Sequence, residues 1–418
     1  MLLSPSTMSG MRVVFFAGAG DAFHTFREWK DGRPDAKSSH VTYSSQFYDV
    51  CRELGAEALV LCSNRNAPSE PLTNGSITLE ARPDWLAGAT RWRYQARQWA
   101  FARSLIADVE RFGANVLVTQ DQPHLFLFAG LRLRGVSIIQ VVPCVLWPTH
   151  APRSATNRAV TSLLGLLYPN LCDAVLTMSA DIDRQIVGAT RAARRTAPPI
   201  ANYFPHYRPE MYGGLPPAER GPVVRFMFVG RVEADKGVFA LLDIASRLRA
   251  RGRHDIAFEI CGSGTALDEL RTRAAAEKLE ETFVINGWCD RDKLREVYAR
   301  SYAVVVPTTI QFVEGFNQVV VEALLAGRPV ITSNVCPAVD YVAPAILQVP
   351  PDDVGAYERA IVQLADDVEL HRRLRQACEP VCRKFLDEST SFRTALRHAL
   401  TAVSARTAMA PRPLPAVP

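Results

Sequence analysis

The sequence predicts an α/β protein made of two domains, each built around a mainly parallel sheet. Short apolar runs alternate along the chain with longer amphipathic segments, as strands alternate with helices in such sheets. The alternation breaks at residues 196–222, where seven prolines and the pair Gly213-Gly214 predict a linker. A chain of 418 residues is long enough for two ordinary domains, so we expect one on each side of this linker.

The first domain is expected to cover residues 11–203, and its first strand ends in the glycine turn Gly18-Ala19-Gly20. Short apolar runs predict its strands, at 12–17, 58–62, 115–119, 137–142 and 174–178. Longer segments with apolar residues at helical spacing predict its helices, at 40–54, 91–112, 125–133 and 156–168. The polar, turn-rich stretch 64–84 is expected to be a loop.

The second domain is expected to cover residues 204–384 with the same alternation. Its predicted strands lie at 225–229, 257–261, 283–285 and 303–306, followed by one that starts at Val330 and one that ends at Val349. Its predicted helices lie at 238–251, 266–279, 291–300, 318–326, 354–365 and 368–384. A last helix is expected at 391–403, and the Pro- and Ala-rich tail 405–418 is expected to be disordered.

The composition is that of an ordinary soluble globular protein, with 48% hydrophobic and 22% charged residues. The nine cysteines form no C-x-x-C pair, as in a protein with reduced thiols. No run of 18 apolar residues predicts a membrane span, and residues 1–10 lack the basic start and apolar centre of a signal peptide. We therefore expect a cytoplasmic location.

Charge is distributed unevenly between the two halves. By count, residues 11–203 carry 21 Lys and Arg against 16 Asp and Glu, whereas residues 204–384 carry 23 against 25. A mildly basic first half suits an anionic membrane surface or an anionic substrate, and random variation of the surface is the alternative. The predicted helix 91–112 carries several arginines with Trp92, Trp99 and Phe101, as an interfacial helix does, although core packing explains it equally well. Peripheral contact with the inner face of a membrane is therefore one expectation, and no nucleic-acid partner is expected.

Ligands of open parallel sheets bind at the carboxyl ends of the strands, where loops lead into helices. The loop after strand 225–229 begins at Gly230 and ends at Gly237, with Arg231 and Lys236 between them. Glycines allow a close approach of the backbone, and two cations suit a diphosphate. Solvated loop charges are the alternative.

Two further glycine turns are weaker signals. Gly262-Ser263-Gly264 follows the strand 257–261 and fits a dinucleotide-binding turn, but no third glycine follows it. Gly18 and Gly20 follow the first strand of the other domain. Their spacing would bring backbone to a phosphate across a cleft, and a simple tight turn is the alternative.

The segment 303–331 places two carboxylates in an apolar setting. Its loop Glu314-Gly315-Phe316-Asn317 leads into the helix 318–326, with Asn317 as the expected N-cap. This loop brings a carboxylate, free backbone N–H groups and a helix N-terminus to one point. A carboxylate accepts hydrogen bonds from sugar hydroxyls, and Glu322 within the helix is suited to a ribose diol. A buried ion pair with an arginine is the alternative for Glu322.

These features together resemble the retaining glycosyltransferases of family 4, which have the GT-B architecture of two Rossmann-like domains facing a cleft. The resemblance is carried by Gly230-Arg231, Lys236-Gly237, Gly262-x-Gly264, the E-x7-E pair Glu314 and Glu322, and the tract 326–331. It covers the second domain nearly end to end. In the first domain it covers only the first glycine turn and Asp173-Ala174-Val175 leading to Ser179.

The resemblance implies that the second domain binds a nucleotide diphosphate sugar and that the first binds an acceptor. By the same resemblance Arg231 and Lys236 bind the diphosphate, Glu314 contacts the donor sugar, and Glu322 holds the ribose. The donor-binding set is completed by Gly18, Gly20, Gly230, Gly262, Gly264, Gly315, Phe316 and Asn317. The last helix, within residues 385–404, is expected to cross back onto the first domain.

The first domain departs from the family at one candidate position. The family often has a histidine just after the strand that matches 137–142, near the C6 hydroxyl of the sugar, where this chain has Pro143-Cys144. His124 and His150 are candidates to replace it on the acceptor side, and a structural histidine is the alternative for each. The usual Asn-Gly turn at the linker is Asn202-Tyr203 here.

The implied reaction transfers a sugar, with retention of configuration, to a saccharide or lipid-linked acceptor, as in surface polysaccharide or glycoconjugate synthesis. Arg231, Lys236 and the helix N-terminus near Asn317 would stabilise the leaving diphosphate, so no metal and no further cofactor is expected. The pair Asp181 and Asp183 is interpreted as a complement to a helix dipole and not as a metal site.

Three alternatives remain open from the sequence. A sugar-nucleotide epimerase of the same shape would bind the donor but need acid and base carboxylates and no acceptor. An NAD-dependent oxidoreductase would use Gly262-Ser263-Gly264, but the following strand leads into Asn286-Gly287 and not into an acidic residue. A non-catalytic scaffold would have lost the ligand cluster, which is present.

Overall fold

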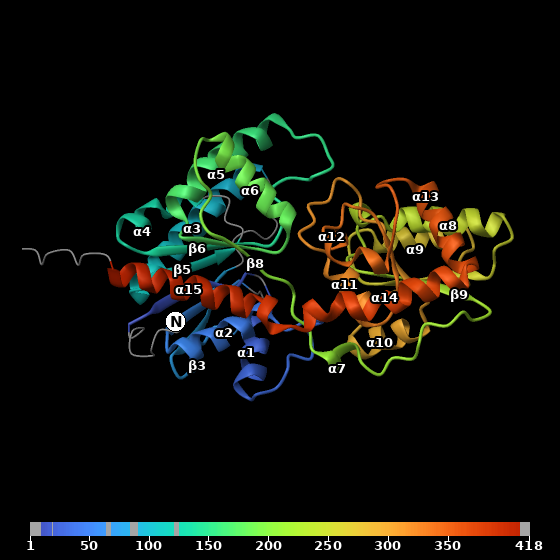
Figure 1. The fold of residues 1–418 in the computed structure, drawn as a ribbon, viewed down its shortest axis with the longest axis horizontal. Helices are drawn as coiled ribbons and strands as arrows, with labels where there is room; N and C mark the ends of the chain where they lie inside the picture. The colour runs from blue at the N-terminus through green and yellow to red at the C-terminus, as the bar shows by residue number, and fades with distance from the viewer. Residues whose placement is uncertain (1–9, 19, 64–67, 84–90, 121–124, 410–418) are drawn as a thin grey trace, which may run out of the picture.

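The chain folds into two α/β domains that lie side by side (Figure 1). The structure is a computed structural model, and it describes residues 10–18, 20–63, 68–83, 91–120 and 125–409. Each domain has a central sheet covered by helices, and all strands are parallel except one at an edge of the first sheet. The predicted α/β class with two doubly wound domains is confirmed.

The first sheet has eight strands in the order β3-β4-β2-β1-β5-β6-β7-β8. Its strands are β1 (Arg12–Phe16), β2 (Glu57–Cys62), β3 (Leu72–Asn74), β4 (Ile77–Ala81), β5 (Val116–Gln120), β6 (Ser137–Val142), β7 (Ala174–Thr177) and β8 (Ile200–Asn202). Its helices are α1 (Ala22–Lys30), α2 (Tyr43–Leu54), α3 (Arg91–Phe112), α4 (Ala129–Leu133), α5 (Ala155–Leu171) and α6 (Ala180–Ala192). The central strands are continuous apolar runs because helices cover both of their faces, and every residue of β6 is buried.

The second sheet has six parallel strands in the order β11-β10-β9-β12-β13-β14. Its strands are β9 (Val224–Val229), β10 (Ile256–Cys261), β11 (Phe283–Gly287), β12 (Ala303–Val306), β13 (Val330–Thr332) and β14 (Ile346–Gln348). Its helices are α8 (Val238–Ala250), α9 (Leu267–Ala276), α10 (Arg291–Arg300), α11 (Gln318–Leu325), α12 (Val339–Val342) and α13 (Val354–Asp366). All of its neighbouring strands are joined by crossovers, which turn the carboxyl ends of β9, β10 and β12 toward one edge.

Short polar residues and a glycine set several helix ends. The side chain of Thr42 accepts from the Ser45 N–H at the start of α2, and Gly55 ends the same helix in the left-handed conformation. Asp290 and Asp353 cap α10 and α13 in the same way as Thr42 caps α2. These local signals explain why the observed boundaries of those helices lie close to the predicted ones.

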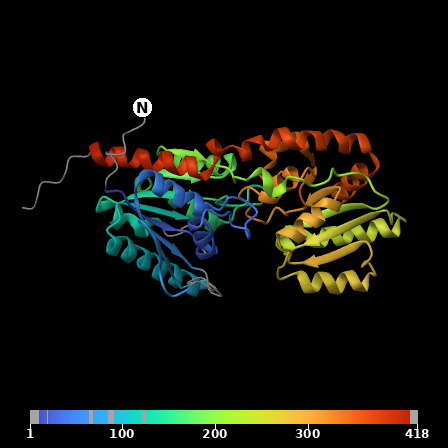
Figure 2. The same ribbon diagram turned by 90° about the horizontal axis from the view of Figure 1, so that it is seen from below.

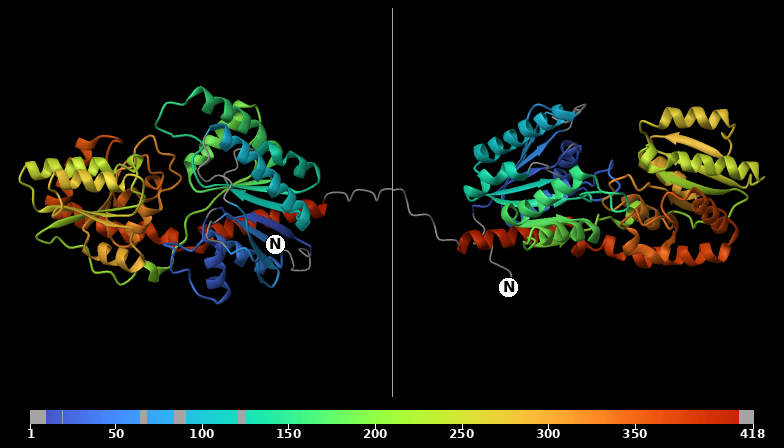
Figure 3. Two further views of the ribbon diagram at one scale, coloured as in Figure 1. Left: turned by 180° about the vertical axis from the view of Figure 1, so that it is seen from behind. Right: turned by 90° about the horizontal axis from the view of Figure 1, so that it is seen from above.

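Two segments cross between the domains. The linker carries the short helix α7 (Pro209–Tyr212), and the buried guanidinium of Arg328 donates to the linker carbonyl of Pro216 and to that of Ala299. Helix α14 (Val368–Leu386) leads into α15 (Phe392–Met409), which packs on α2, β7 and β8 of the first domain. Figure 2 and Figure 3 show these two red helices running along one side of both domains.

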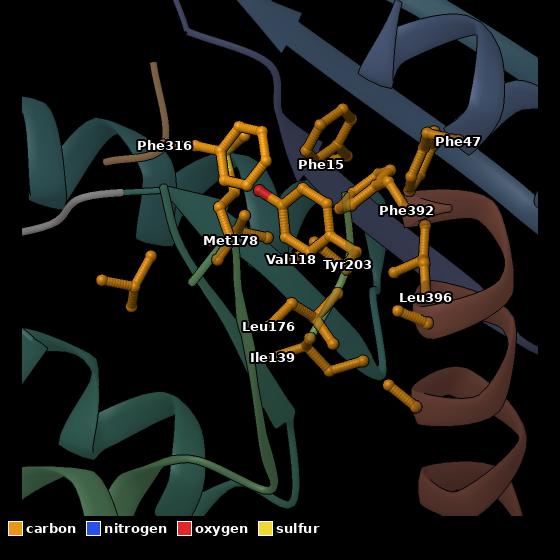
Figure 4. Packing of buried hydrophobic residues seen from close by; sticks show 14 of the residues in the cluster. Phe15, Phe47, Val118, Ile139, Leu176, Met178, Tyr203, Phe316, Phe392 and Leu396 are labelled. Carbon is orange, nitrogen blue, oxygen red and sulfur yellow. The ribbon is translucent and has the colours of Figure 1, made fainter. Parts of the chain in front are cut away.

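Aromatic side chains pack where the domains meet. The rings of Phe316 and Phe204 lie 5.7 Å apart, and those of Phe204 and Phe385 lie 5.4 Å apart. Tyr203 packs on Phe392 at 5.1 Å, and Figure 4 shows Tyr203 between Phe392 and Phe316. This core holds the loop before α11 against the first domain.

The stretch 64–84 differs from the expected loop, because it contains the hairpin β3–β4. Gly75 has a φ of 60° at its turn, so Asn74-Gly75 is the hairpin signal that the sequence interpretation missed. Helix α1 was also not predicted. Its stretch mixes polar and aromatic residues, and its buried face became visible only through contact with α2.

The linker and the C-terminus differ from expectation too. Strand β8 and helix α7 lie within residues 196–222, so this segment is ordered against both domains. Helix α15 continues through residues 405–409, which were expected to be disordered, and residues 410–418 lie outside the described ranges. None of the helices in the described ranges is both long and apolar enough to cross a membrane.

Candidate functional site

A cavity of about 500 Å³ lies between the two domains. The second domain lines it with the loops that follow β9 and β12 and with α11. The first domain lines it with Ser39, Tyr43, Pro143, Cys144 and Met178. This is the edge at which open parallel sheets bind their ligands, so the cavity is the candidate site.

Lys236, Glu314 and Asn317 form a polar cluster in this cavity. Lys236 Nζ lies 2.8 Å from Glu314 Oε2, and Asn317 Nδ2 donates to the same oxygen over 3.1 Å. Only 15% of the Lys236 side chain and 11% of the Glu314 side chain are exposed. Lys236 Nζ also lies 3.6 Å from the centroid of the Phe312 ring. The shielded cluster therefore holds an ammonium and a carboxylate in fixed positions at the cavity wall.

Asn317 does not cap α11 with its side chain, contrary to the sequence prediction. Its backbone is left-handed, with φ 68° and ψ 79°, and its amide turns to Glu314 and to Cys336 Sγ, 3.2 Å away. A non-glycine residue held in this region is strained and usually has a functional reason. The first N–H groups of α11 are left without a side-chain cap, and an anion at the cavity would satisfy them.

Glycines of the predicted loops make backbone contacts that exclude any side chain. A Cβ on Gly315 would lie 1.8 Å from the carbonyl oxygen of Pro143 in the first domain. A Cβ on Gly262 or Gly264 would lie 1.8 or 2.2 Å from carbonyl oxygens of the loop after β9. The sequence interpretation predicted that these glycines belong to the donor-binding site. The structure shows that Gly262 and Gly264 pack two loops together, while Gly315 brings the two domains into contact.

Glu322 lines the cavity from the middle of α11, although its side chain is almost fully buried. Burial raises its pKa to about 7, and a hydrogen bond with Ser39 of the first domain opposes that rise. No ion pair with an arginine, the alternative considered from the sequence, involves Glu322 in the described part of the chain. Burial, with a smaller contribution from the charge of Glu322, also raises the pKa of Tyr298 well above its usual value.

Arg231 is exposed and lines both this cavity and an adjoining one of about 220 Å³. The second cavity is bounded by Gly262, Ser263 and Trp288, and the Trp288 side chain is 74% exposed. The sequence interpretation missed Trp288, although its place just after β11 was a usable signal. An exposed indole beside a cation offers a flat face to an aromatic group of a ligand.

Some predicted residues lie apart from this cluster. Gly18 and Gly20 line neither cavity, and the Gly18 carbonyl accepts from the Ser63 N–H within the first domain. His150 lies outside both cavities, where its Nε2 is 3.0 Å from the carbonyl oxygen of Asn334 in the second domain. His124 lies outside the described residues.

The first domain contributes residues that sequence reasoning did not find. Tyr43 Oη accepts a hydrogen bond from Gln318 Nε2 over 3.1 Å, which joins α2 to α11 across the domain boundary. Ser39 reaches Glu322 from the same end of α2. A Ser and a Tyr at a helix start have no distinguishing local pattern, so only the contact between domains reveals them.

Residues 218–379 match the sequence model of the family described as Glycosyl transferases group 1. Among curated proteins, the Alpha-D-kanosaminyltransferase of Streptomyces kanamyceticus is 28% identical over 162 residues, which are 38% of this chain and 40% of that protein. The chain therefore spans about two fifths of the length of this relative. The family match concerns the domain that carries the polar cluster.

Solved structures resemble the whole chain. Sucrose-phosphate synthase from Thermosynechococcus elongatus superimposes with a TM-score of 0.70 at 16% identity, covering 95% of this chain and 100% of that one. The Anabaena protein HepE in complex with UDP and glucose superimposes with a TM-score of 0.60 at 13% identity, covering 95% and 98%. At these identities the likeness concerns the fold, and it confirms the expected GT-B architecture.

Proposed function

We propose that this protein is a glycosyltransferase that moves a sugar from a nucleotide diphosphate sugar to a saccharide or lipid-linked acceptor. The observation that carries the proposal is the cluster of Lys236, Glu314 and Asn317 at the start of α11, in a cavity between two domains. It joins a cation for phosphate, a carboxylate for sugar hydroxyls and a helix N-terminus in one place. The family match of residues 218–379 and the kanosaminyltransferase relative support the same class.

The donor is proposed to extend along the second-domain side of the two cavities. Its sugar would lie at Glu314 and its diphosphate between Lys236, Arg231 and the first turn of α11. Its ribose would meet Glu322, and its base would stack on Trp288 in the adjoining cavity. The Anabaena neighbour, which holds UDP and glucose, supports a nucleotide-sugar donor for this fold.

The proposed chemistry follows from where charge develops. The bond between the anomeric carbon and the diphosphate oxygen breaks, so positive charge grows on the sugar ring and negative charge on the leaving group. Lys236, Arg231 and the uncapped start of α11 would stabilise that leaving group by electrostatics already in place. The acceptor oxygen forms the new bond to the anomeric carbon, and its proton passes to the departing phosphate oxygen. This proposal uses no metal and no further cofactor.

Retention of configuration is part of the proposal. Glu314 and Glu322 are the carboxylates that line the cavity, and both come from the second domain. Among the described residues, the first-domain side of the lining offers Ser39, Tyr43 and Cys144 but no carboxylate. A cavity without a carboxylate nucleophile opposite the donor suits attack by the acceptor from the face that the diphosphate leaves.

The proposed setting is the synthesis of surface polysaccharide or another glycoconjugate in the cytoplasm. We also propose that the basic first domain makes peripheral contact with the inner face of the membrane that would carry a lipid-linked acceptor. The family match and the relative named above are glycosyltransferases, and they support neither an epimerase nor an NAD-dependent oxidoreductase. Gly264 of the G-x-G turn packs against the neighbouring loop, which argues against a dinucleotide-binding turn.

A donor screen tests the proposal. The full-length protein is incubated with UDP- and GDP-sugars and a panel of saccharide and lipid-linked acceptors, and nucleotide release is measured. Acceptor-dependent release of nucleotide is expected with at least one donor. Conversion of a donor to its epimer without nucleotide release would establish the epimerase instead. Thermal stabilisation by NAD, with none by UDP or GDP, would favour the oxidoreductase.

A further inference from the structure

Helix α5 lies on the outside of the first domain (Figure 1). It exposes a stripe of apolar side chains. Val160, Leu163 and Leu166 lie three residues apart on one face and are 47%, 46% and 44% exposed. The helix cannot rotate to bury them, because a Cβ on Gly165 would lie 2.2 Å from the carbonyl oxygen of Ala189 in α6. Single exposed leucines are normal on proteins, but three on one helix face indicate a contact surface.

The sequence had pointed to a different helix for membrane contact. In α3, the expected interfacial residue Phe101 is buried and packs on Phe16 at 4.7 Å. Trp99 packs edge-on against Phe126 at 5.5 Å, and the side chain of Trp92 lies outside the described residues. Trp99 is 46% exposed, but it is the one large apolar side chain of α3 that is exposed among the described residues, whereas α5 exposes three.

The segment 125–203, which contains α4, α5 and α6, carries the excess positive charge of the first domain. By count, residues 11–124 contain 13 Lys and Arg against 13 Asp and Glu, whereas residues 125–203 contain 8 against 3. The three acidic side chains are engaged within this segment. Asp173 accepts from Arg132, Asp181 pairs with Arg184, and Asp183 accepts from Thr177 and Asn202. Two acidic residues from outside the segment add partners, Glu110 for Arg134 and Asp340 for Arg184.

Three of these arginines lie at the end of α6, the helix that packs on α5. Arg191, Arg194 and Arg195 are exposed at the end of α6, and none of them forms an ion pair in the described ranges. The neighbouring Ala193 lies 3.3 Å from the Cβ position built on Gly165, so this end of α6 is beside the middle of α5. Apolar side chains flanked by unneutralised arginines form an amphipathic surface.

We propose that the α5 surface, defined as Val160, Leu163, Leu166, Arg191, Arg194 and Arg195, docks on an anionic lipid bilayer. Leucine side chains enter the boundary between headgroups and acyl chains, and arginines bind the anionic headgroups. Pairing with a second copy of this chain through the same face would bring the arginines of both copies together, which like-charge repulsion opposes. Charge complementarity thus selects the bilayer as the occupant.

The place of the surface relates it to the candidate site. Helix α5 begins directly after the segment 143–154, and Pro143 and Cys144 at the start of that segment line the interdomain cavity. A bilayer at α5 would bring a lipid-linked acceptor beside the first-domain side of the cavity. This consequence rests on the proposed function, whereas the binding test needs neither donor nor acceptor.

The test is co-sedimentation of the full-length protein with vesicles. Vesicles of phosphatidylcholine with about one third phosphatidylglycerol are expected to bind the protein at low salt, and binding should fall as salt rises. Each basic residue near such a surface changes the partition coefficient about fivefold, so Arg191→Gln with Arg194→Gln should weaken binding on the order of 20-fold. Leu163→Ser should weaken binding even at constant charge.

Matched variants of the second domain provide the controls. Arg359→Gln with Arg373→Gln removes the same charge from exposed helix positions, and Val368→Ser removes an apolar side chain that is 54% exposed. Both controls should bind as the wild type does. Equal losses in the control and α5 variants would overturn the proposal, as would absence of sedimentation with anionic vesicles at low salt. So would a dimer in lipid-free solution that Leu163→Ser dissociates. Glycosyl transfer without vesicle binding would reject the surface and leave the proposed activity standing.

Discussion

The two sides of the interdomain cavity differ in charge. The second-domain side carries Lys236, Glu314, Arg231 and Glu322, with the start of α11 among them. The first-domain side carries Ser39, Tyr43, Pro143, Cys144 and Met178, none of which is an acidic or basic side chain. The net charge of the domains differs as well, since residues 11–203 carry 21 Lys and Arg against 16 Asp and Glu, and residues 204–384 carry 23 against 25.

This difference separates two tasks within the proposed reaction. Groups that stabilise a charged leaving group must be fixed before the reaction, and one rigid domain holds all of them here. The neutral side meets the other substrate through shape and hydrogen bonds, and it is positioned by contacts between domains. Substitutions on the charged side should therefore lower turnover strongly, whereas those on the neutral side should have smaller effects that depend on how the domains fit together.

The largest effect is expected for Lys236→Ala. Loss of one preorganised cation at the leaving group should lower kcat on the order of 10²- to 10³-fold. Glu314→Ala should cause a comparable loss, because the two side chains form one ion pair at 2.8 Å. The measurement is nucleotide release at saturating donor, with circular dichroism to verify that each variant is folded.

Lys293→Ala is the matched control for Lys236→Ala. Lys293 also forms an ion pair with a glutamate, at 3.0 Å from Glu296. It lies on α10 and does not line the cavity. It should turn over at the wild-type rate. Full activity of Lys236→Ala would show that the diphosphate does not bind at Lys236, contrary to the proposal.

The buried carboxyl of Glu322 should make stability depend on pH. Its pKa is raised from 4.5 to about 7 by burial, so it is neutral in the folded protein between these values while the unfolded chain is ionised. Its contribution to stability is therefore fully present below pH 4.5 and is lost as pH rises toward 7. The loss should reach up to about 3 kcal/mol in the free energy of unfolding.

Glu322→Gln isolates this contribution, because the amide has the same shape and does not titrate. Urea midpoints of both proteins are measured from pH 4.5 to pH 7.5. The wild-type midpoint should fall relative to that of Glu322→Gln over this range and then level off. Parallel curves for the two proteins would mean that the carboxylate is already solvated or paired in the folded state.

A smaller effect is expected for Gly315→Ala, which acts on the contact between the two sides. Gly315 does not have a positive φ, so alanine fits its backbone, but the added Cβ would lie 1.8 Å from the Pro143 carbonyl oxygen. Overpacking of this kind costs about 1–3 kcal/mol, so kcat/KM should fall roughly tenfold as the domains are forced apart. Gly130→Ala is the control, because no atom lies within 4 Å of its Cβ position. Unchanged kcat/KM in Gly315→Ala would show that the cavity does not need this contact.

The charged side of the cavity could be predicted from the sequence because its parts follow strands that are recognisable as short apolar runs. Lys236 and Glu314 are 78 positions apart, yet each lies in a loop after an apolar run that the pattern identified as a strand. The parallel sheet then brings these loops to one edge. The prediction that the Asn317 side chain caps α11 was wrong, because helix-capping preference does not include the competing hydrogen bond to Glu314.

The neutral side could not be predicted because no local pattern encodes a contact between domains. Ser39 and Tyr43 acquire their place only when α2 meets α11, and the role of Gly315 depends on a carbonyl group 172 positions earlier in the chain. The exposed stripe of α5 was hidden for the same reason. Its leucines follow a helical pattern that is equally typical of a core-facing helix, and only the position of α6 shows which face is left outside.

The smallest effect is expected for Tyr43→Phe, which removes one neutral hydrogen bond between the two sides. The bond from Gln318 to the Tyr43 hydroxyl joins the domains at 3.1 Å, and a neutral hydrogen bond of this kind contributes about 0.5–1.5 kcal/mol. A three- to tenfold fall in kcat/KM is therefore expected. Tyr94→Phe is the matched control, because Gln98 donates to the Tyr94 hydroxyl at 3.0 Å within α3. If both variants lose activity equally, the loss comes from general destabilisation. If only Tyr43→Phe is impaired, the neutral side acts by holding the second domain in place.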